Sequence, residues 1–270
     1  MERMNHQDAW DQSSRWVSMF RKHKAILVTC GAFLGFGMGL SSAQAQTAQY
    51  RVDFDVTWSS TTHPGAIHPL SHFDSVTGAT HSDAVSFWRV GELATPGVKQ
   101  EAEEGVSPLF DDELNAALTA GTAHGLINEP GWICPGEVSH ANCRAPNFTF
   151  EASESHSKVT FLAMIGPSPD WFVGVSEVAL RDNGAWVTTP IVLPILPYDG
   201  GTRSNDATFG QFGPLNNPPE AISLITDTSG QFMGGASLGT MTITLIPEPA
   251  TAVLLGLGLG GLALVRRRSR

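Results

Sequence analysis

The chain has 270 residues, of which 41% are hydrophobic, and a formal net charge of −10. Residues 46–249 contain 7 Lys and Arg against 23 Asp and Glu, a balance of −16, so the basic residues gather towards the two ends. An acidic body of this kind repels a phosphate backbone, which excludes nucleic acid as a partner, and it suits divalent cations instead.

The first 45 residues predict an export signal. A basic cluster ends at Lys24, an apolar stretch covers residues 25–40, and Ala43 and Ala45 form the small-x-small pattern of a signal-peptidase site. We therefore expect an N-terminal signal peptide over residues 1–45, with cleavage after Ala45. The polar stretch before the basic cluster is long for such a signal, which leaves three possible starts: Met1, Met4 and Met19.

Short apolar segments predict a β-rich domain over residues 46–246. YRVDFDVTW at residues 50–58 alternates strictly between apolar and polar side chains, as a half-buried strand does. SKVTFLAMI at 157–165 is more continuously apolar and indicates a more buried strand. We expect further strands at WFVGV (171–175), VSFWRV near Phe87, the segment around Trp186, PIVLPI near Val192, AISLIT near Leu224 and MTITLI (241–246). That makes about eight strands.

Helical character is confined to two stretches, EAEEGV at residues 101–106 and DDELNAALTA at 111–120. Asp111 or Asp112 is expected to cap the second helix, and Leu114 and Leu118 to face the core. Long loops are expected after Trp58 and over residues 123–146. Short strands separated by many of the 28 glycines and 17 prolines are typical of a β-sandwich.

Three cysteines are present, and Cys30 would leave with the signal peptide. Cys134 and Cys143 then form an even pair in a compartment that permits disulfides. Closing their loop of roughly ten residues stabilises by about 2–3 kcal/mol. The alternative is a metal site of the two thiols with His140, but the spacing matches no zinc pattern.

Two other groups of side chains are candidate ligands. Four histidines lie close together in the sequence: His63, His68, His72 and His81. They suggest zinc or copper only weakly, because their spacing crosses a Pro-rich loop. Asp170, after a proline, and Asp199, in PYDGGT, are acids at the ends of strands, where the oxygen ligands of Ca²⁺ converge in β-sandwiches. The alternative for each Asp is a side chain that caps a turn.

Residues 247–270 predict a sorting signal. Pro247, Glu248 and Pro249 precede an apolar run at 250–265, after which come basic residues: Arg266, Arg267, Arg268 and Arg270. This layout resembles the PEP-CTERM signal of Gram-negative, biofilm-forming bacteria. The resemblance implies processing by an exosortase-type membrane protease after transient anchoring through the apolar helix. The alternative is a permanent C-terminal anchor with the basic residues on the cytoplasmic side.

Several segments of the body, in order, resemble the spondin domain: WSSTTHP at residues 58–64, HF at 72–73, GATH at 78–81, EAEEG at 101–105, PDWFVGV at 169–175 and PYDGGT at 197–202. The similarity runs from about Tyr50 to Leu245. It implies an all-β fold, an antiparallel eight-stranded β-sandwich of the spondin type, here with signal helices at both ends.

The resemblance also implies a calcium ion at one end of the sandwich. In this sequence Asp170 and Asp199 occupy two ligand positions of the family, while Arg203 stands where a third acid is expected. A guanidinium cannot ligate a cation. Either Asn205 or Asp206 takes the third place, or Arg203 pairs with Asp170 or Asp199 and replaces the ion.

No catalytic motif such as HExxH, GxSxG or a Walker loop is present. We therefore expect a non-catalytic binding or adhesion module at the cell surface or in the extracellular matrix, with a glycan or other surface component as ligand. Two alternatives remain: a passive component of an exopolysaccharide matrix, and an enzyme acting on matrix glycans with Glu103 and Asp170 as acid and base. The enzyme would need two carboxyl groups at a defined separation.

Overall fold

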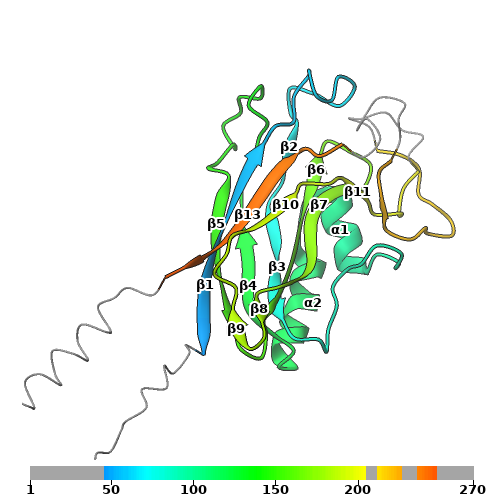
Figure 1. Cartoon of the computed structure of the whole chain (residues 1–270). Coiled ribbons are helices and arrows are strands. Elements are labelled where there is room, and N and C mark those ends of the chain that lie inside the picture. The colour runs from blue at the N-terminus through cyan, green and yellow to red at the C-terminus, as the bar shows by residue number, and fades with distance from the viewer. Residues whose placement is uncertain (1–45, 205–211, 227–235, 248–270) are drawn as a thin grey trace, which may run out of the picture. The chain divides into compact units, whose positions relative to one another are not determined.

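Two antiparallel sheets and two helices make up the part of the chain that the computed structural model describes, residues 46–204, 212–226 and 236–247 (Figure 1). The smaller sheet has the strand order β10 (Ile191–Pro194), β13 (Gly239–Ile246), β1 (Thr47–Val56), β5 (Asn147–Ser153). The larger sheet has the order β12 (Ser223–Leu224), β11 (Tyr198–Asp199), β7 (Trp171–Ala179), β6 (Lys158–Gly166), β3 (Val76–His81), β4 (Ala123–Glu129). Two short additions complete the pattern: β2 (His72–Phe73), which pairs with β6, and the hairpin of β8 (Arg181–Asp182) with β9 (Ala185–Trp186). The predicted all-β class is confirmed.

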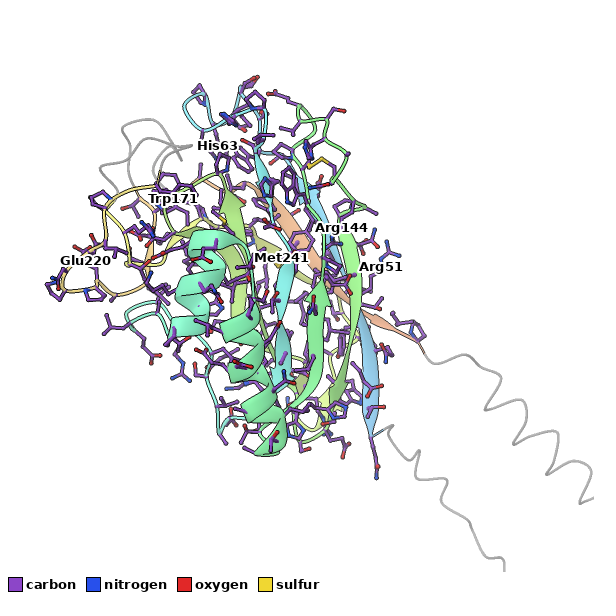
Figure 2. The ribbon with its side chains drawn as sticks, turned by 180° about the vertical axis from the view of Figure 1, so that it is seen from behind. Arg51, His63, Arg144, Trp171, Glu220 and Met241 are labelled. Carbon is purple, nitrogen blue, oxygen red and sulfur yellow. A yellow bond between two sulfur atoms is a disulfide. The ribbon has the colours of Figure 1, made fainter. Side chains whose placement is uncertain are left out.

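Strand β1 has the alternation that its sequence predicts. Tyr50, Val52 and Phe54 are buried between the sheets, whereas Arg51 lies exposed on the outer side (Figure 2). The strand pairs with β13 on one side and β5 on the other, so its inward face meets apolar side chains in both directions. The hydroxyl of Tyr50 donates to the carbonyl of Leu180 at 2.9 Å, which satisfies the one polar group this face buries.

The continuous apolar sequence of β6 predicts a more buried strand, and the structure shows it buried on both faces. Its odd-numbered residues, such as Phe161, enter the core between the sheets, and Leu162 enters a second core on the opposite face. The two helices cover that opposite face of the larger sheet (Figure 1). The domain therefore has three layers: the smaller sheet, the larger sheet and the two helices. A strand in the middle layer has no solvent-exposed face, so its sequence does not alternate between apolar and polar residues.

The helices begin and end at different residues from those predicted. Helix α1 spans Pro96–Glu104 and α2 spans Pro108–Thr119, so the second helix begins before both proposed caps, Asp111 and Asp112, and its N-cap residue is Ser107. Proline in the first turn, where amide donors have no helical acceptor, explains this start. Leu114 is buried as predicted, but Leu118 is 40% exposed, so its predicted inward orientation is wrong.

Two segments differ in type from the prediction. The predicted strand at VSFWRV near Phe87 is irregular instead, and Phe87 and Trp88 pack into the core beneath the helices. Conversely, the predicted loop at 123–146 begins with strand β4, which pairs with β3 along the edge of the larger sheet. Within the described residues, no helix is long and apolar enough to cross a membrane.

Candidate functional site

Strand pairing brings together two acids that are far apart in sequence. Asp199 ends β11 and lies opposite Trp171, the first residue of β7, while Asp170 immediately precedes Trp171. The amide of Gly200 donates to the backbone carbonyl of Asp170 at 2.9 Å, which continues the ladder past the strand ends. Figure 2 labels Trp171, at the start of β7, and Glu220, in the loop that precedes β12.

Asp170 is completely buried. Its Oδ2 accepts two hydrogen bonds, from the amide of Thr202 at 2.7 Å and the amide of Arg203 at 2.9 Å, and lies 3.0 Å from the hydroxyl of Thr202. Its Oδ1 is buried and has no hydrogen-bond partner in the described part of the chain. Burial and the charge of Asp199 raise the pKa of Asp170 to about 6, against the hydrogen bonds that favour the ionised form.

Asp199 is the second buried acid, with 6% of its surface exposed. Its Oδ1 accepts a hydrogen bond from the amide of Gly201 at 2.7 Å. Gly201 has a φ of +70°, and a Cβ there would lie 2.3 Å from the carbonyl oxygen of Glu220, so only glycine fits this turn. The sequence PYDGGT thus fixes the position of the Asp199 carboxylate.

The guanidinium of Arg203 does not bond to Asp170. One Nη donates to Oε2 of Glu103 at 2.8 Å and the other donates to the carbonyl oxygen of Gly213 at 2.9 Å. Only the backbone amide of Arg203 reaches Asp170. Of the two sequence-based expectations for Arg203, an internal ion pair is present, but its acid is Glu103 rather than Asp170 or Asp199.

Glu103 lies on the last turn of α1 and is only 3% exposed. Besides Arg203, its carboxylate accepts hydrogen bonds from the ammonium of Lys99 and, at 2.7 Å, from the hydroxyl of Thr202. The contribution of Lys99 and Thr202 was not anticipated from the sequence. The i,i+4 spacing of Lys99 and Glu103 was a usable signal, whereas nothing local pointed to Thr202.

The structure brings together the two acids of the enzyme hypothesis, Glu103 and Asp170, because the hydroxyl of Thr202 contacts both of them. Neither carboxylate is presented to a substrate: both are buried, and Glu103 already forms ion pairs with two cationic side chains. The arrangement is that of a structural charge cluster, which gives catalysis by this pair no geometric support.

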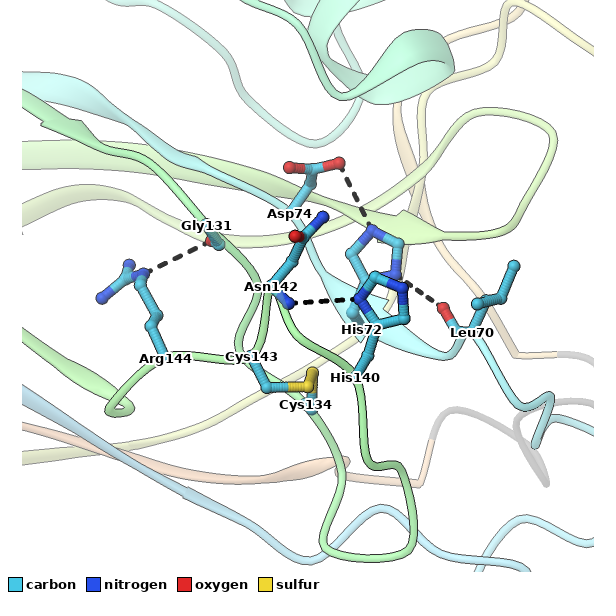
Figure 3. The surroundings of a disulfide bond; sticks show 9 residues. All are labelled: Leu70, His72, Asp74, Gly131, Cys134, His140, Asn142, Cys143 and Arg144. Carbon is cyan, nitrogen blue, oxygen red and sulfur yellow. Dashed lines mark hydrogen bonds and ion pairs between the residues drawn. A yellow bond between two sulfur atoms is a disulfide. The ribbon is translucent and has the colours of Figure 1, made fainter.

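The predicted disulfide is present between Cys134 and Cys143, with Cα atoms 5.6 Å apart (Figure 3). The alternative metal site of these thiols with His140 is therefore wrong. Instead the ring of His140 stacks on Trp132 at 4.5 Å, and Trp132 stacks in turn on His72 at 3.7 Å.

The clustered histidines are separate core or loop residues. His63, His72 and His81 are buried, and each ring has its own hydrogen-bond partners, such as Thr160 for His81. Among the residues that the structure describes, no three His, Cys, Asp or Glu side chains are grouped so that they could hold a metal ion. Asp170 and Asp199 thus form a pair, and the proposed additional ligands, Asn205 and Asp206, lie outside the described residues.

The remaining predicted sites lie at the ends of the chain. The cleavage residues Ala43 and Ala45, and Glu248, Pro249 and the arginines of the sorting signal, are outside the described residues. Pro247 is exposed at the end of the last described segment, directly after β13.

Comparison with known proteins identifies the family. The Spondin_N family model matches residues 48–232. Spondin-2 of Homo sapiens is 32% identical over 209 residues, which cover 76% of this chain and 60% of the relative. Spondin-1 of Gallus gallus is 34% identical over 188 residues, 67% of this chain and 22% of the relative. The alignments thus span less than two thirds of each relative. The family-model match includes both strand-end acids. Because the family model covers more than half of the sequence, the chain belongs to the Spondin_N family.

Proposed function

We propose that this protein is an exported, non-catalytic binding module of the cell surface or extracellular matrix, and that it holds Ca²⁺ with Asp170 and Asp199. Export rests on the predicted signal peptide at residues 1–45, and delivery to the surface on the PEP-CTERM-like signal at 247–270, read by an exosortase-type protease. Membership of the Spondin_N family supports a binding role rather than catalysis.

The observation that carries the calcium proposal is the buried Oδ1 of Asp170. A buried carboxylate oxygen without a hydrogen-bond partner is costly, and a second carboxylate beside it raises the cost further. A divalent cation would remove both penalties, and carboxylate and carbonyl oxygens are the ligands that Ca²⁺ prefers. Asp170 and Asp199 would supply carboxylate oxygens to an ion that takes roughly six to eight oxygen ligands. Bound there, Ca²⁺ would supply positive charge that ties the Asp170 turn to the Asp199 turn.

The calcium proposal is tested by calorimetric titration of the purified protein with Ca²⁺, together with thermal melting with and without the ion. The wild type should bind saturably and melt at a higher temperature with Ca²⁺, because a ligand of the folded state stabilises it. Asp199→Ala should lose both effects. Asp55→Ala, which removes an exposed acid from β1, is the matched control and should behave like the wild type. Equal binding by all three proteins would refute a site at the acid pair.

The ligand class is tested separately. A glycan or other surface component that binds through this end of the sandwich should bind saturably and be released by a calcium chelator. Absence of saturable binding to purified exopolysaccharide or to cell-surface preparations would favour the alternative, a passive matrix component.

Deletion of residues 247–249, followed by fractionation of the cells, tests the sorting route: the protein should then stay in the membrane fraction.

A further inference from the structure

We propose that Glu103 is a positioning residue that holds Arg203 away from the Asp170–Asp199 pair and so keeps these carboxylates available to a divalent cation. This inference rests on the proposed calcium site. It explains how the chain can carry an arginine where the family resemblance implies a third acid.

Arg203 is anchored immediately beside the acid pair. Its backbone amide donates to Oδ2 of Asp170 at 2.9 Å, so the guanidinium starts from a point next to this carboxylate. The other oxygen of Asp170, Oδ1, is buried and unbonded within the described residues. A guanidinium with no other anionic partner would be drawn to that oxygen, since arginine and carboxylate form strong charge-assisted hydrogen bonds.

The guanidinium is nevertheless directed elsewhere. Its two Nη atoms bond to Glu103 at 2.8 Å and to the carbonyl of Gly213 at 2.9 Å, while its Nε is buried and has no acceptor in the described part of the chain. The cluster therefore contains one buried unbonded donor on Arg203 and one buried unbonded acceptor on Asp170 that do not bond to each other. Contacts at the far end of the side chain hold the guanidinium in an orientation that leaves both unsatisfied.

Glu103 is well suited to this restraint. It is 3% exposed, so water screens its charge only weakly, and its backbone is held in helix α1. The hydroxyl of Thr202 contacts Oε1 of Glu103 at 2.7 Å and Oδ2 of Asp170 at 3.0 Å, which fixes the two carboxylates relative to each other. A glutamine at this position keeps an Oε1 acceptor for the Thr202 hydroxyl, so it removes the charge that holds Arg203 and retains the link to Asp170.

The charge balance of the cluster leads to the same conclusion. Lys99 and Arg203 supply two positive charges against three negative charges, those of Glu103, Asp170 and Asp199. The cluster is net negative and can accept a cation. Without the Glu103 charge the positive and negative charges become equal, and Arg203 can neutralise Asp170 internally.

The test compares four proteins by calorimetric Ca²⁺ titration and by the Ca²⁺-induced rise in melting temperature: wild type, Glu103→Gln, Arg203→Gln and the double variant. Glu103→Gln should weaken Ca²⁺ binding at least about tenfold, as expected when a buried carboxylate gains a competing internal partner. The double variant should recover affinity to within about threefold of the wild type, because its cluster has the same net charge and no guanidinium. Glu104→Gln removes an exposed charge one residue away and serves as the control, with unchanged binding.

Each result distinguishes the two proposals. If the wild type binds and Glu103→Gln binds equally well, the role of Glu103 is refuted while the calcium site stands. If the wild type does not bind Ca²⁺, both proposals are refuted. Loss of binding in Glu103→Gln without recovery in the double variant would show damage unrelated to Arg203 and would also refute the role. If Glu103→Gln does not fold, Arg203→Gln decides: it should bind Ca²⁺ at least as tightly as the wild type, and weaker binding overturns the inference.

Discussion

On the two sides of helix α1, the surroundings shift the pKa of a buried carboxyl group in opposite directions. Glu101 and Glu103 lie two residues apart, one fully buried and the other 3% exposed. Burial raises the pKa of Glu101 to about 7. Burial also acts to raise the pKa of Glu103, but hydrogen bonds from Lys99, Thr202 and Arg203 outweigh it and hold the pKa below its ordinary value.

The two pKa values differ because the hydrogen-bond partners and neighbouring charges differ, since both side chains are almost equally buried. Oε2 of Glu101 accepts one hydrogen bond, from the hydroxyl of Ser107 at 2.7 Å, and Oε1 is buried without a partner among the described residues. The nearby charges on that side, Asp74 and Asp111, are negative and raise the pKa further. One side of the helix therefore stores unfavourable electrostatic energy, and the other side, beside the candidate calcium site, is compensated.

The largest expected effect comes from removing the compensated acid. Glu103→Ala leaves two cationic side chains without their shared partner, and breaking a buried ion pair in this way costs about 3–5 kcal/mol, with the lower end expected because Lys99 and Arg203 reach solvent. Because the folded pKa of Glu103 is lowered, this cost is present above its ordinary value of 4.5 and shrinks as the pH falls through the folded pKa. Urea unfolding at pH 7 and at pH 4 measures it. If Glu103→Ala were as stable as the wild type at pH 7, the conclusion that its ion pairs stabilise the fold would be contradicted.

Glu101→Gln should have the opposite sign. The folded pKa of Glu101, about 7, lies above its ordinary value of 4.5, so its ionisation destabilises the fold increasingly as the pH rises through that interval. The neutral amide should therefore stabilise the protein by about 3–3.5 kcal/mol at pH 8, at about 1.4 kcal/mol per pKa unit. Below about pH 4.5 the gain should vanish. The midpoint of urea unfolding, followed from pH 4 to pH 8, gives this curve, and a gain that does not depend on pH would rule out ionisation as its cause.

How far the sequence predicts such features depends on whether they are local. β1 was predicted from its period-two alternation and β6 from its long apolar run, because both patterns are visible in the local sequence. β3 was not, because its sequence VTGATH is small and polar: a Cβ at Gly78 would lie 2.2 Å from the carbonyl oxygen of Thr160, so close packing against β6 selects glycine there. The aromatic run near Phe87 resembled a strand but is buried beneath the helices.

The same division holds at the site. Asp170 and Asp199 were identified because each lies in a recognisable segment at a strand end. The ion pair of Arg203 with Glu103 joins residues 100 positions apart, and only the packing of α1 against the larger sheet makes it possible. Strand-end position and the family resemblance therefore located the acid pair, but they could not identify Glu103 as the partner of Arg203.

A smaller effect tests the single partner of Glu101. Ser107→Ala removes the hydroxyl that lowers the pKa of Glu101, so that pKa should rise above about 7. Loss of this hydrogen bond should cost about 1 kcal/mol at neutral pH. The start of α2 should be unaffected, because the side chain of Ser107 makes no capping hydrogen bond. NMR titration of the Glu101 carboxyl carbon measures the shift; a pKa that falls would contradict the assignment of Ser107 as its donor.

Lys99→Ala should have the smallest effect and separates the two cations of Glu103. The side chain of Lys99 is 40% exposed, whereas that of Arg203 is 24% exposed. Water and salt screen the lysine, so its loss should cost at most about 0.5–1 kcal/mol, less still at high ionic strength. Unfolding in low salt and in about 1 M NaCl checks this, since the Debye length falls to about 3 Å there. A larger or salt-independent cost would mean that Lys99, and not Arg203 and Thr202 alone, keeps Glu103 ionised in the interior.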